Sequence, residues 1–204
     1  GAPLDVKAGD TIVADYIDLV TSGGGAVTRT SSPAVAVLGG TTGTIVASAD
    51  IQSGDGLRIQ VTDSDLNVSF TTAETASATV TNNTNGDVET ITLTETGINT
   101  GIFRATPPAT TGSGSATSGD GTVQVSAHDN ITVRYADALD VNGGPQNIDA
   151  TVQGVLWGDT SDNAKLGALD ASQILQRSIT FLAFNAYQET VANVDGSSGD
   201  NPFD

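Results

Sequence analysis

Residues 78–94 read Ala-Thr-Val-Thr-Asn-Asn-Thr-Asn-Gly-Asp-Val-Glu-Thr-Ile-Thr-Leu-Thr. Apolar and polar side chains alternate on both sides of Asn85-Gly-Asp87, which is the pattern of strands that turn one face to a core and the other to water. An Asn-Gly pair between two such segments favours a tight turn, because both residues tolerate positive φ angles. We therefore expect an antiparallel hairpin formed by residues 78–81 and 88–94.

The same alternation recurs from about residue 44 to residue 154, in short segments separated by Gly, Asn, Asp and Pro clusters. Segments rich in Thr and β-branched residues, about 8–12 residues apart, are typical of an antiparallel β-sandwich. The small, polar stretch 110–121 is expected to be a mobile surface loop. The expected inward-facing residues are Leu57, Ile59, Val61, Ile91, Leu93, Val123, Val125, Ile131, Val133, Tyr135, Ile148, Ala150 and Val152.

Several longer sequence motifs in this segment resemble the immunoglobulin-like repeats of large prokaryotic surface proteins. They are Val61-Thr-Asp-Ser-Asp-Leu-Asn67, Glu89-Thr-Ile-Thr-Leu-Thr-Glu-Thr-Gly97, Asn99-Thr-Gly-Ile-Phe-Arg104, Gly119-Asp-Gly-Thr-Val-Gln-Val125 and Ile131-Thr-Val-Arg-Tyr-Ala-Asp-Ala138. The resemblance implies an immunoglobulin-like β-sandwich over residues 38–155 that serves as a surface or adhesion module. It brings no catalytic chemistry with it, and we expect that the protein is not an enzyme.

The composition restricts the choice of partners. The chain of 204 residues has 7 Lys and Arg against 24 Asp and Glu, a net charge of −17, and this disfavours nucleic acid and anionic lipid partners. It contains no Cys and a single His, which excludes disulfides, thiolate chemistry and multi-histidine metal sites. No apolar run approaches the roughly 20 residues that span a bilayer. The start Gly-Ala-Pro and the absence of Met are expected of a processed, secreted or cell-surface form, or of an engineered form that lost its Met.

An internal repeat involves the start of the chain. Residues 6–18 align without gaps on residues 125–137, and the glycine pairs at 24–25 and 143–144 fall at the same offset. Residues 1–37 therefore resemble the last two strands of a second domain that lacks the strands before them; the alternative is a chance similarity between two β-rich segments. Two strands alone are marginal in water, so they must pack on the sandwich of their own chain or on another copy. We expect the second, in which exchanged strands link copies of the chain into a homo-polymer.

The composition changes at Trp157, which we expect to seal the junction to a third region, residues 156–204. Residues 158–172 read Gly-Asp-Thr-Ser-Asp-Asn-Ala-Lys-Leu-Gly-Ala-Leu-Asp-Ala-Ser and resemble the first calcium loop of a dockerin module. A helix is expected to follow, through about residue 184. The ligands that the resemblance implies are Asp159, Ser161, Asn163, the carbonyl of Lys165, Gly167 through a water, and Asp170.

Residues 193–204 are similar to a second dockerin loop. Its implied ligands are Asn193, Asp195, Ser197, the carbonyl of Gly199, Asn201 and Asp204. The sequence departs from the family where Ala164 replaces the usual Gly, where the second loop begins with Asn, and where no second helix follows it. The alternative to calcium is an acidic helix cap at Asp170 followed by an acidic tail.

Two functions remain open at this stage. The first is a secreted, calcium-binding structural subunit of an extracellular filament or surface assembly that self-associates through β-strand exchange. The second is a dockerin-bearing adhesive or scaffold-docking component that binds a cohesin, although the residues late in the loops, Ala168-Leu169 and Pro202-Phe203, are mostly apolar.

A further acidic group consists of Asp63 and Asp65 with Glu74 or Glu95. These residues either bind a further calcium ion or are solvated turn carboxylates. His128 is expected at a turn.

Overall fold

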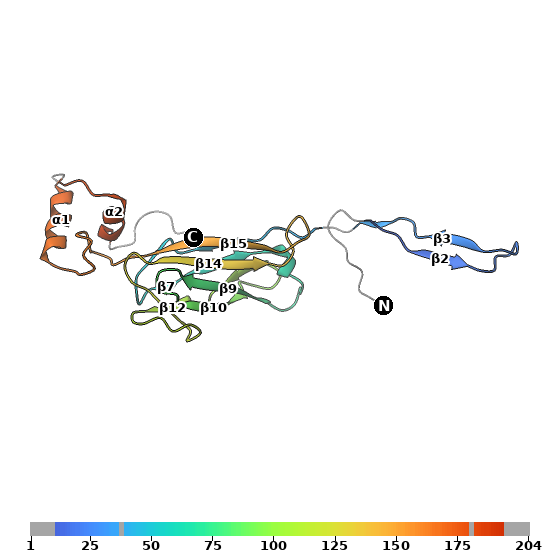
Figure 1. Ribbon diagram of the computed structural model, residues 1–204, viewed down its shortest axis with the longest axis horizontal. Coiled ribbons are helices and arrows are strands. Elements are labelled where there is room, and N and C mark those ends of the chain that lie inside the picture. The colour runs from blue at the N-terminus through green and yellow to red at the C-terminus, as the bar shows by residue number, and fades with distance from the viewer. Residues whose placement is uncertain (1–10, 37–38, 180–181, 194–204) are drawn as a thin grey trace. The chain divides into compact units, whose positions relative to one another are not determined.

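The computed structural model describes residues 11–36, 39–179 and 182–193. The chain divides into two compact units, one formed by residues 1–43 with 136–146 and the other by residues 44–135 with 147–204. Figure 1 shows the elements of both. Among the described residues, no helix is long and apolar enough to cross a membrane.

The larger unit is mainly β. One sheet has eight strands in the order β5-β8-β11-β10-β9-β14-β15-β6, and a second has three in the order β13-β12-β7. The bounds are β5 Thr44–Ala47, β6 Asp50–Ile51, β7 Gly56–Leu57, β8 Ile59–Thr62, β9 Thr75–Asn82, β10 Val88–Glu95, β11 Ile102–Arg104, β12 Ala109–Gly112, β13 Thr122–Gln124, β14 Asn130–Asp137 and β15 Gln146–Gly154, with a 3₁₀ turn at Ser64–Leu66.

The predicted hairpin is confirmed. Strands β9 and β10 pair antiparallel from Val88 opposite Thr81 to Thr94 opposite Thr75. Gly86 has a φ of 82°, and its N–H donates to the carbonyl of Asn82, which closes the turn. The Asn-Gly signal therefore placed the turn between these two strands of eight residues each.

Both sheets contribute to one apolar core. Leu57 and Val123 reach it from the three-stranded sheet, and Val61, Phe103 and Val133 reach it from the eight-stranded sheet; each of these side chains is at most 1% exposed. Period-two alternation produces this burial, because every second side chain of a strand points to the same face. Two sheets over a shared core are consistent with a β-sandwich, and residues 44–135 with 147–155 are called the sandwich below.

Two strand pairs differ from the antiparallel expectation. Strand β12 runs parallel to β13, and β15 runs parallel to β6. The connection from β12 to β13 must therefore reverse direction before β13 begins. The carboxylate of Glu89 holds it by accepting hydrogen bonds from the N–H groups of Gly119, Asp120 and Gly121 at 2.7, 3.1 and 2.9 Å. The expectation of a mobile loop at 110–121 is corrected accordingly, since its start is strand β12 and its end is anchored.

The smaller unit contains two short antiparallel pairs. Strand β1 (Thr11–Ile12) pairs with β4 (Val35–Ala36), and β2 (Asp15–Asp18) pairs with β3 (Val27–Thr30). The β2–β3 hairpin is labelled in Figure 1. Its apolar side chains are largely exposed, including Tyr16 at 65% and Val20 at 80%, so the hairpin has no core of its own.

The C-terminal region contains two helices, α1 (Ala168–Ser178) and α2 (Ala186–Ala192). The predicted helix is therefore shorter than expected, because it ends at Ser178 rather than near residue 184. Helix α2 lies beyond the end of that expected helix. Asn185 caps it, since the Asn185 side chain accepts from the N–H of Gln188 while the Gln188 side chain accepts from the N–H of Asn185.

Candidate metal site

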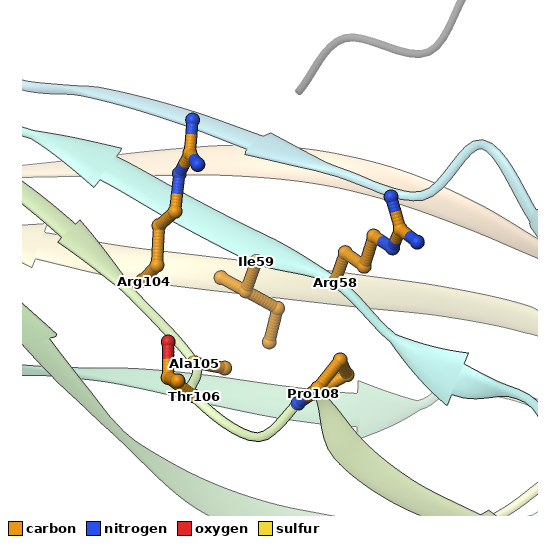
Figure 2. A pocket seen from close by; sticks show the side chains of 6 residues that line it. All are labelled: Arg58, Ile59, Arg104, Ala105, Thr106 and Pro108. Atoms are coloured by element: carbon orange, nitrogen blue, oxygen red, sulfur yellow. The ribbon is translucent and has the colours of Figure 1, made fainter. Parts of the chain in front are cut away.

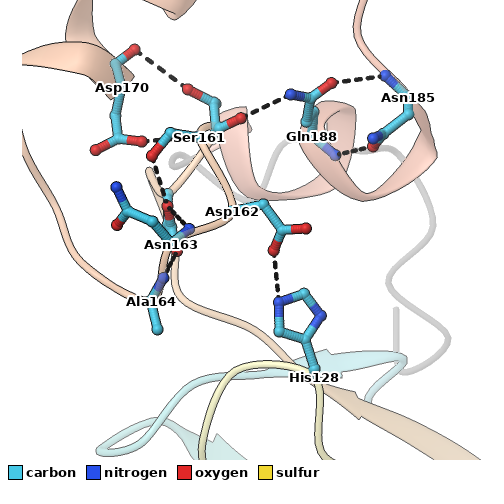
Figure 3. A network of polar contacts seen from close by, with 10 residues as sticks. His128, Ser161, Asp162, Asn163, Ala164, Asp170, Asn185 and Gln188 are labelled. Atoms are coloured by element: carbon cyan, nitrogen blue, oxygen red, sulfur yellow. Dashed lines mark hydrogen bonds and ion pairs between the residues drawn. The ribbon is translucent and has the colours of Figure 1, made fainter.

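The candidate site is the loop between β15 and α1, and Asp159 lies at its centre. This side chain is fully buried, at 0% exposure. Its Oδ1 accepts hydrogen bonds from the N–H of Asn163 at 3.1 Å and from the hydroxyl of Ser161 at 3.3 Å, and its Oδ2 accepts from the N–H of Ala164 at 2.6 Å. The loop therefore folds back around the carboxylate at its own beginning. Figure 3 labels Ser161, Asn163 and Ala164 of this loop together with Asp170.

Asp170 closes the same loop from the first turn of α1. It is 3% exposed, and its two carboxylate oxygens accept from the N–H groups of Ser161 at 2.8 Å and Gly167 at 2.7 Å. Burial alone would raise the pKa of Asp170, but the hydrogen bonds from Ser161 and Gly167 outweigh it and hold the pKa below its ordinary value of 3.8. Asp170 is therefore a charged carboxylate at neutral pH.

The loop backbone turns sharply at two residues other than Gly. Asp162 and Ala164 have φ angles of 61° and 59°, in the left-handed region. Ala164 stands where the dockerin family usually has Gly, and a Cβ in this conformation costs about 1–2 kcal/mol. The loop therefore turns at Ala164 although this residue carries a Cβ.

The structure brings only part of the predicted ligand set together. Ser161 contacts both buried acids, Asp159 through its hydroxyl and Asp170 through its N–H. Asn163 and Gly167 reach the acids through their backbone N–H groups, and Lys165 is exposed. Of the second predicted loop, Asn193 follows α2, where its N–H donates to the carbonyl of Thr190. The other predicted ligands of that loop, Asp195, Ser197, Gly199, Asn201 and Asp204, lie outside the described residues.

The chemistry of the loop fits a hard cation. Its side-chain donors are oxygens from two carboxylates, a hydroxyl and an amide, the set that calcium prefers. Within the described part of the chain, no Lys or Arg forms a salt bridge with Asp159 or Asp170, so these two buried acids face backbone N–H groups instead of a basic side chain. No group of three or more acidic or His side chains suited to a metal ion occurs among those residues. The carboxylate pair Asp159 and Asp170 is thus the candidate centre.

Helix α2 supports the loop from a second side. The Gln188 side chain donates to the carbonyl of Thr160 at 2.7 Å, and the N–H of Gly158 donates to the carbonyl of Val191 at 2.6 Å. Burial, together with the carboxylates of Asp162 and Asp159, raises the pKa of Tyr187 on the same helix. The sequence signal for this support was the Asn185–Gln188 capping pair, which the single-helix interpretation overlooked.

His128 joins the loop to the sandwich. Its φ of 67° confirms the predicted turn. Its Nε2 lies 2.6 Å from a carboxylate oxygen of Asp162, and its ring stacks on Tyr187 with centroids 4.5 Å apart. Trp157 contributes to the same joint as predicted, because its Nε1 donates to Asp55 at 3.1 Å and its backbone N–H to Gln52 at 2.9 Å. The pairing of His128 with Asp162 carried no signal in the sequence.

The other acidic group is turned inward. Asp63 is 2% exposed and accepts from the hydroxyl of Tyr135 and from the N–H of Asp65. Glu95 is 5% exposed and accepts from the N–H groups of Thr100 and Gly101 at 2.5 and 2.8 Å. Asp63 and Glu95 are therefore not solvated turn carboxylates, because each organises its own loop.

A separate hollow of about 270 Å³ lies on the sandwich. Figure 2 shows its lining, with the side chains of Arg58 and Arg104 at its rim. The Nε of Arg104 donates to Gln60 at 2.7 Å. The hollow has no carboxylate or His in its lining, so it offers no acid–base pair for catalysis.

Comparisons with known proteins add no family assignment. A scan against protein-family models finds none that matches the chain, and a search of curated proteins finds no match. The functional conclusion therefore depends on the geometry of the loop between β15 and α1 and of the N-terminal hairpin β2–β3.

Proposed function

We propose that this chain is a calcium-binding structural component of an extracellular filament or surface assembly, joined to its neighbours through β-strand exchange. The observation that carries the proposal is the convergence of two buried carboxylates, Asp159 and Asp170, on one short loop with no basic partner among the described residues. In the structure N–H and hydroxyl donors alone compensate these two charges, and a bound calcium ion would add positive charge beside them.

The loop residues would hold the calcium ion, and helix α2 and His128 would connect the ordered loop to the sandwich. Ser161 links the two acids, since its hydroxyl donates to Asp159 and its N–H donates to Asp170, and Asn163, Lys165 and Gly167 complete the proposed set. The ion would supply positive charge between the acids. Helix α2 and His128 hold the loop from outside, so that ordering the loop also fixes its attachment to the sandwich.

The test is a calcium titration of the Asp159→Ala, Asp170→Ala double variant. A ligand that binds only the folded state raises the melting temperature, so wild type should melt higher in calcium and the double variant should not respond. Isothermal titration calorimetry should show binding to wild type and, at this loop, none to the variant. Asp15→Ala is the control, because it removes an exposed acid outside the loop and should leave the calcium response unchanged. An equal calcium response in wild type and in the double variant would refute the site.

A second candidate function is supported by the surface of α1. Leu169 and Leu175 on α1 and Ile179 at its C-terminal cap are 56%, 64% and 54% exposed. Exposed apolar side chains on a helix next to the loop would suit the docking of a cohesin-like partner. Capture of a purified cohesin domain by wild type, and loss of that capture with calcium binding retained in Leu175→Asp, would favour this alternative.

A further inference from the structure

The hairpins β2–β3 and β14–β15 have the same internal geometry at an offset of 119 residues. In one, the N–H of Thr21 donates to Gly25 and that of Gly24 donates to Thr21; in the other, the N–H of Asp140 donates to Gly144 and that of Gly143 donates to Asp140. The side chain of Asp18 accepts from the N–H of Val20, as the side chain of Asp137 accepts from the N–H of Leu139. The repeat seen in the sequence therefore extends to the hydrogen bonds of the two turns.

The two hairpins differ in burial. Tyr135, Val133 and Ile131 on the inward face of β14 are 4%, 0% and 0% exposed. Tyr16, the counterpart of Tyr135, is 65% exposed, and Ala14, the counterpart of Val133, is exposed as well. The face of β2 thus has the residue types of a buried strand without the burial.

The surroundings of β14 show what such a face requires. Strand β14 lies between β9 and β15 in the sheet. On its β9 side, Val133 lies opposite Val80 and Arg134 lies opposite Thr79. The hydroxyl of Tyr135 donates to the buried Asp63. A partner for β2 must accordingly offer an apolar strand edge equivalent to β9 and a buried carboxylate equivalent to Asp63.

We propose that β2–β3 is the closing hairpin of a second sandwich of this type, and that β2 pairs there with the strand equivalent to β9 while Tyr16 donates to the carboxylate equivalent to Asp63. This inference rests on the proposed function and identifies the partner in the strand exchange. We call the place beside β9 that a closing hairpin occupies the closing slot. In an intact copy, β14 and β15 already occupy it. The acceptor is therefore a sandwich that ends before its own closing hairpin.

The experiment supplies the acceptor strands within one polypeptide. A copy of residues 39–129 is fused directly to Thr11 of the chain, which preserves the repeat offset, since residue 130 is the counterpart of residue 11. If the inference holds, the amides of β2 should exchange with deuterium more than about tenfold more slowly than in the unextended chain, because they then open only with the added sandwich. Unchanged exchange in β2 would overturn the inference.

Two variants of the extended chain provide a matched pair. Ala14→Asp places a charge on the inward face and should restore fast exchange, whereas Val13→Asp, on the opposite face, should not, because successive side chains of a strand point to opposite faces. Equal exchange in the two variants would also overturn the inference.

Calcium titration of the unextended chain tests the proposed function separately. If that chain responds to calcium but β2 of the extended chain is not protected, the acceptor assignment alone is wrong. If the unextended chain does not respond to calcium, the proposed calcium function is wrong.

Discussion

Glu95 illustrates how single carboxylates shape this molecule. It lies at the end of β10, and burial by itself would raise the pKa of Glu95. Hydrogen bonds from Gly101, Thr100 and Glu74 outweigh burial and lower that pKa from its ordinary value of 4.5 to about 2. Because the folded-state pKa is depressed, the ionised side chain stabilises the fold above about pH 4.5, and this stabilisation is lost as the pH falls toward 2.

Glu95→Gln should therefore destabilise the protein at neutral pH, and the difference from wild type should shrink as the pH falls from 4.5 to 2. Thermal melting followed by circular dichroism at several pH values measures both effects. Asp15→Asn, at an exposed carboxylate elsewhere in the chain, serves as the control and should change the profile little. A stability difference that does not depend on pH would contradict the role assigned to the carboxylate.

Ala164 offers a second prediction at the same scale. Its φ of 59° is unfavourable for a residue with a Cβ, and Gly adopts this conformation without that cost. Ala164→Gly should raise stability by about 1 kcal/mol, or about 2–4 °C in melting temperature for a domain of this size. Ala171→Gly, within α1, should instead lower stability by about 1 kcal/mol. A loss of stability in Ala164→Gly would show that this turn is not strained.

At the scale of elements, the sequence predicted what depends on local pattern. The β9–β10 hairpin and most core positions follow from alternation and the Asn-Gly turn, and the structure confirms them. The parallel pairing of β12 with β13 does not follow, because Glu89 fixes that connection from a strand about 30 residues away. Helix α2 carried a local signal in its capping pair, but the apolar spacing used for the prediction ended near residue 184, before α2 begins.

The candidate site was predictable to a similar degree. The resemblance of residues 158–172 to a dockerin calcium loop singled out Asp159 and Asp170, and the structure shows both acids buried. Its attachment through His128 and Tyr187 depends on contacts across 30 or more residues, which spacing along the chain does not reveal. The same limit applied to the inward orientation of Asp63, whose partner Tyr135 lies 72 residues away.

The N-terminal hairpin supplies the prediction at this scale. The buried apolar cluster of the sandwich, as far as the chain is described, draws on residues from Ala47 onward and includes none from β1–β4. Deleting residues 1–37 should therefore leave a folded monomer with the wild-type calcium response at Asp159 and Asp170. Size-exclusion chromatography and calcium-dependent melting are the measurements. Unfolding of the shortened chain would show instead that the hairpin packs within its own molecule.

For the whole molecule, the central question is which hairpin occupies the closing slot. Hairpin β14–β15 is tethered within the same chain, and it places Val133 and Val152 at positions where the N-terminal hairpin has Ala14 and Pro33. Larger apolar side chains bury more surface, so the resident hairpin should hold the slot against a hairpin from another copy. The net charge of −17 on each copy adds repulsion, which salt at 0.15 M screens beyond about 8 Å.

We therefore expect the purified chain to sediment as a monomer of 20.5 kDa at 0.15 M salt, with or without calcium. Val133→Ala with Val152→Ala weakens the resident hairpin by several kcal/mol and should produce oligomers whose size grows with protein concentration. Adding Ala14→Asp to this double variant should return it to a monomer, because the donor face is then charged. Filaments of unmodified chain, seen by electron microscopy without any other protein, would show that the N-terminal hairpin displaces the resident one, which is the homo-polymer that the sequence predicts.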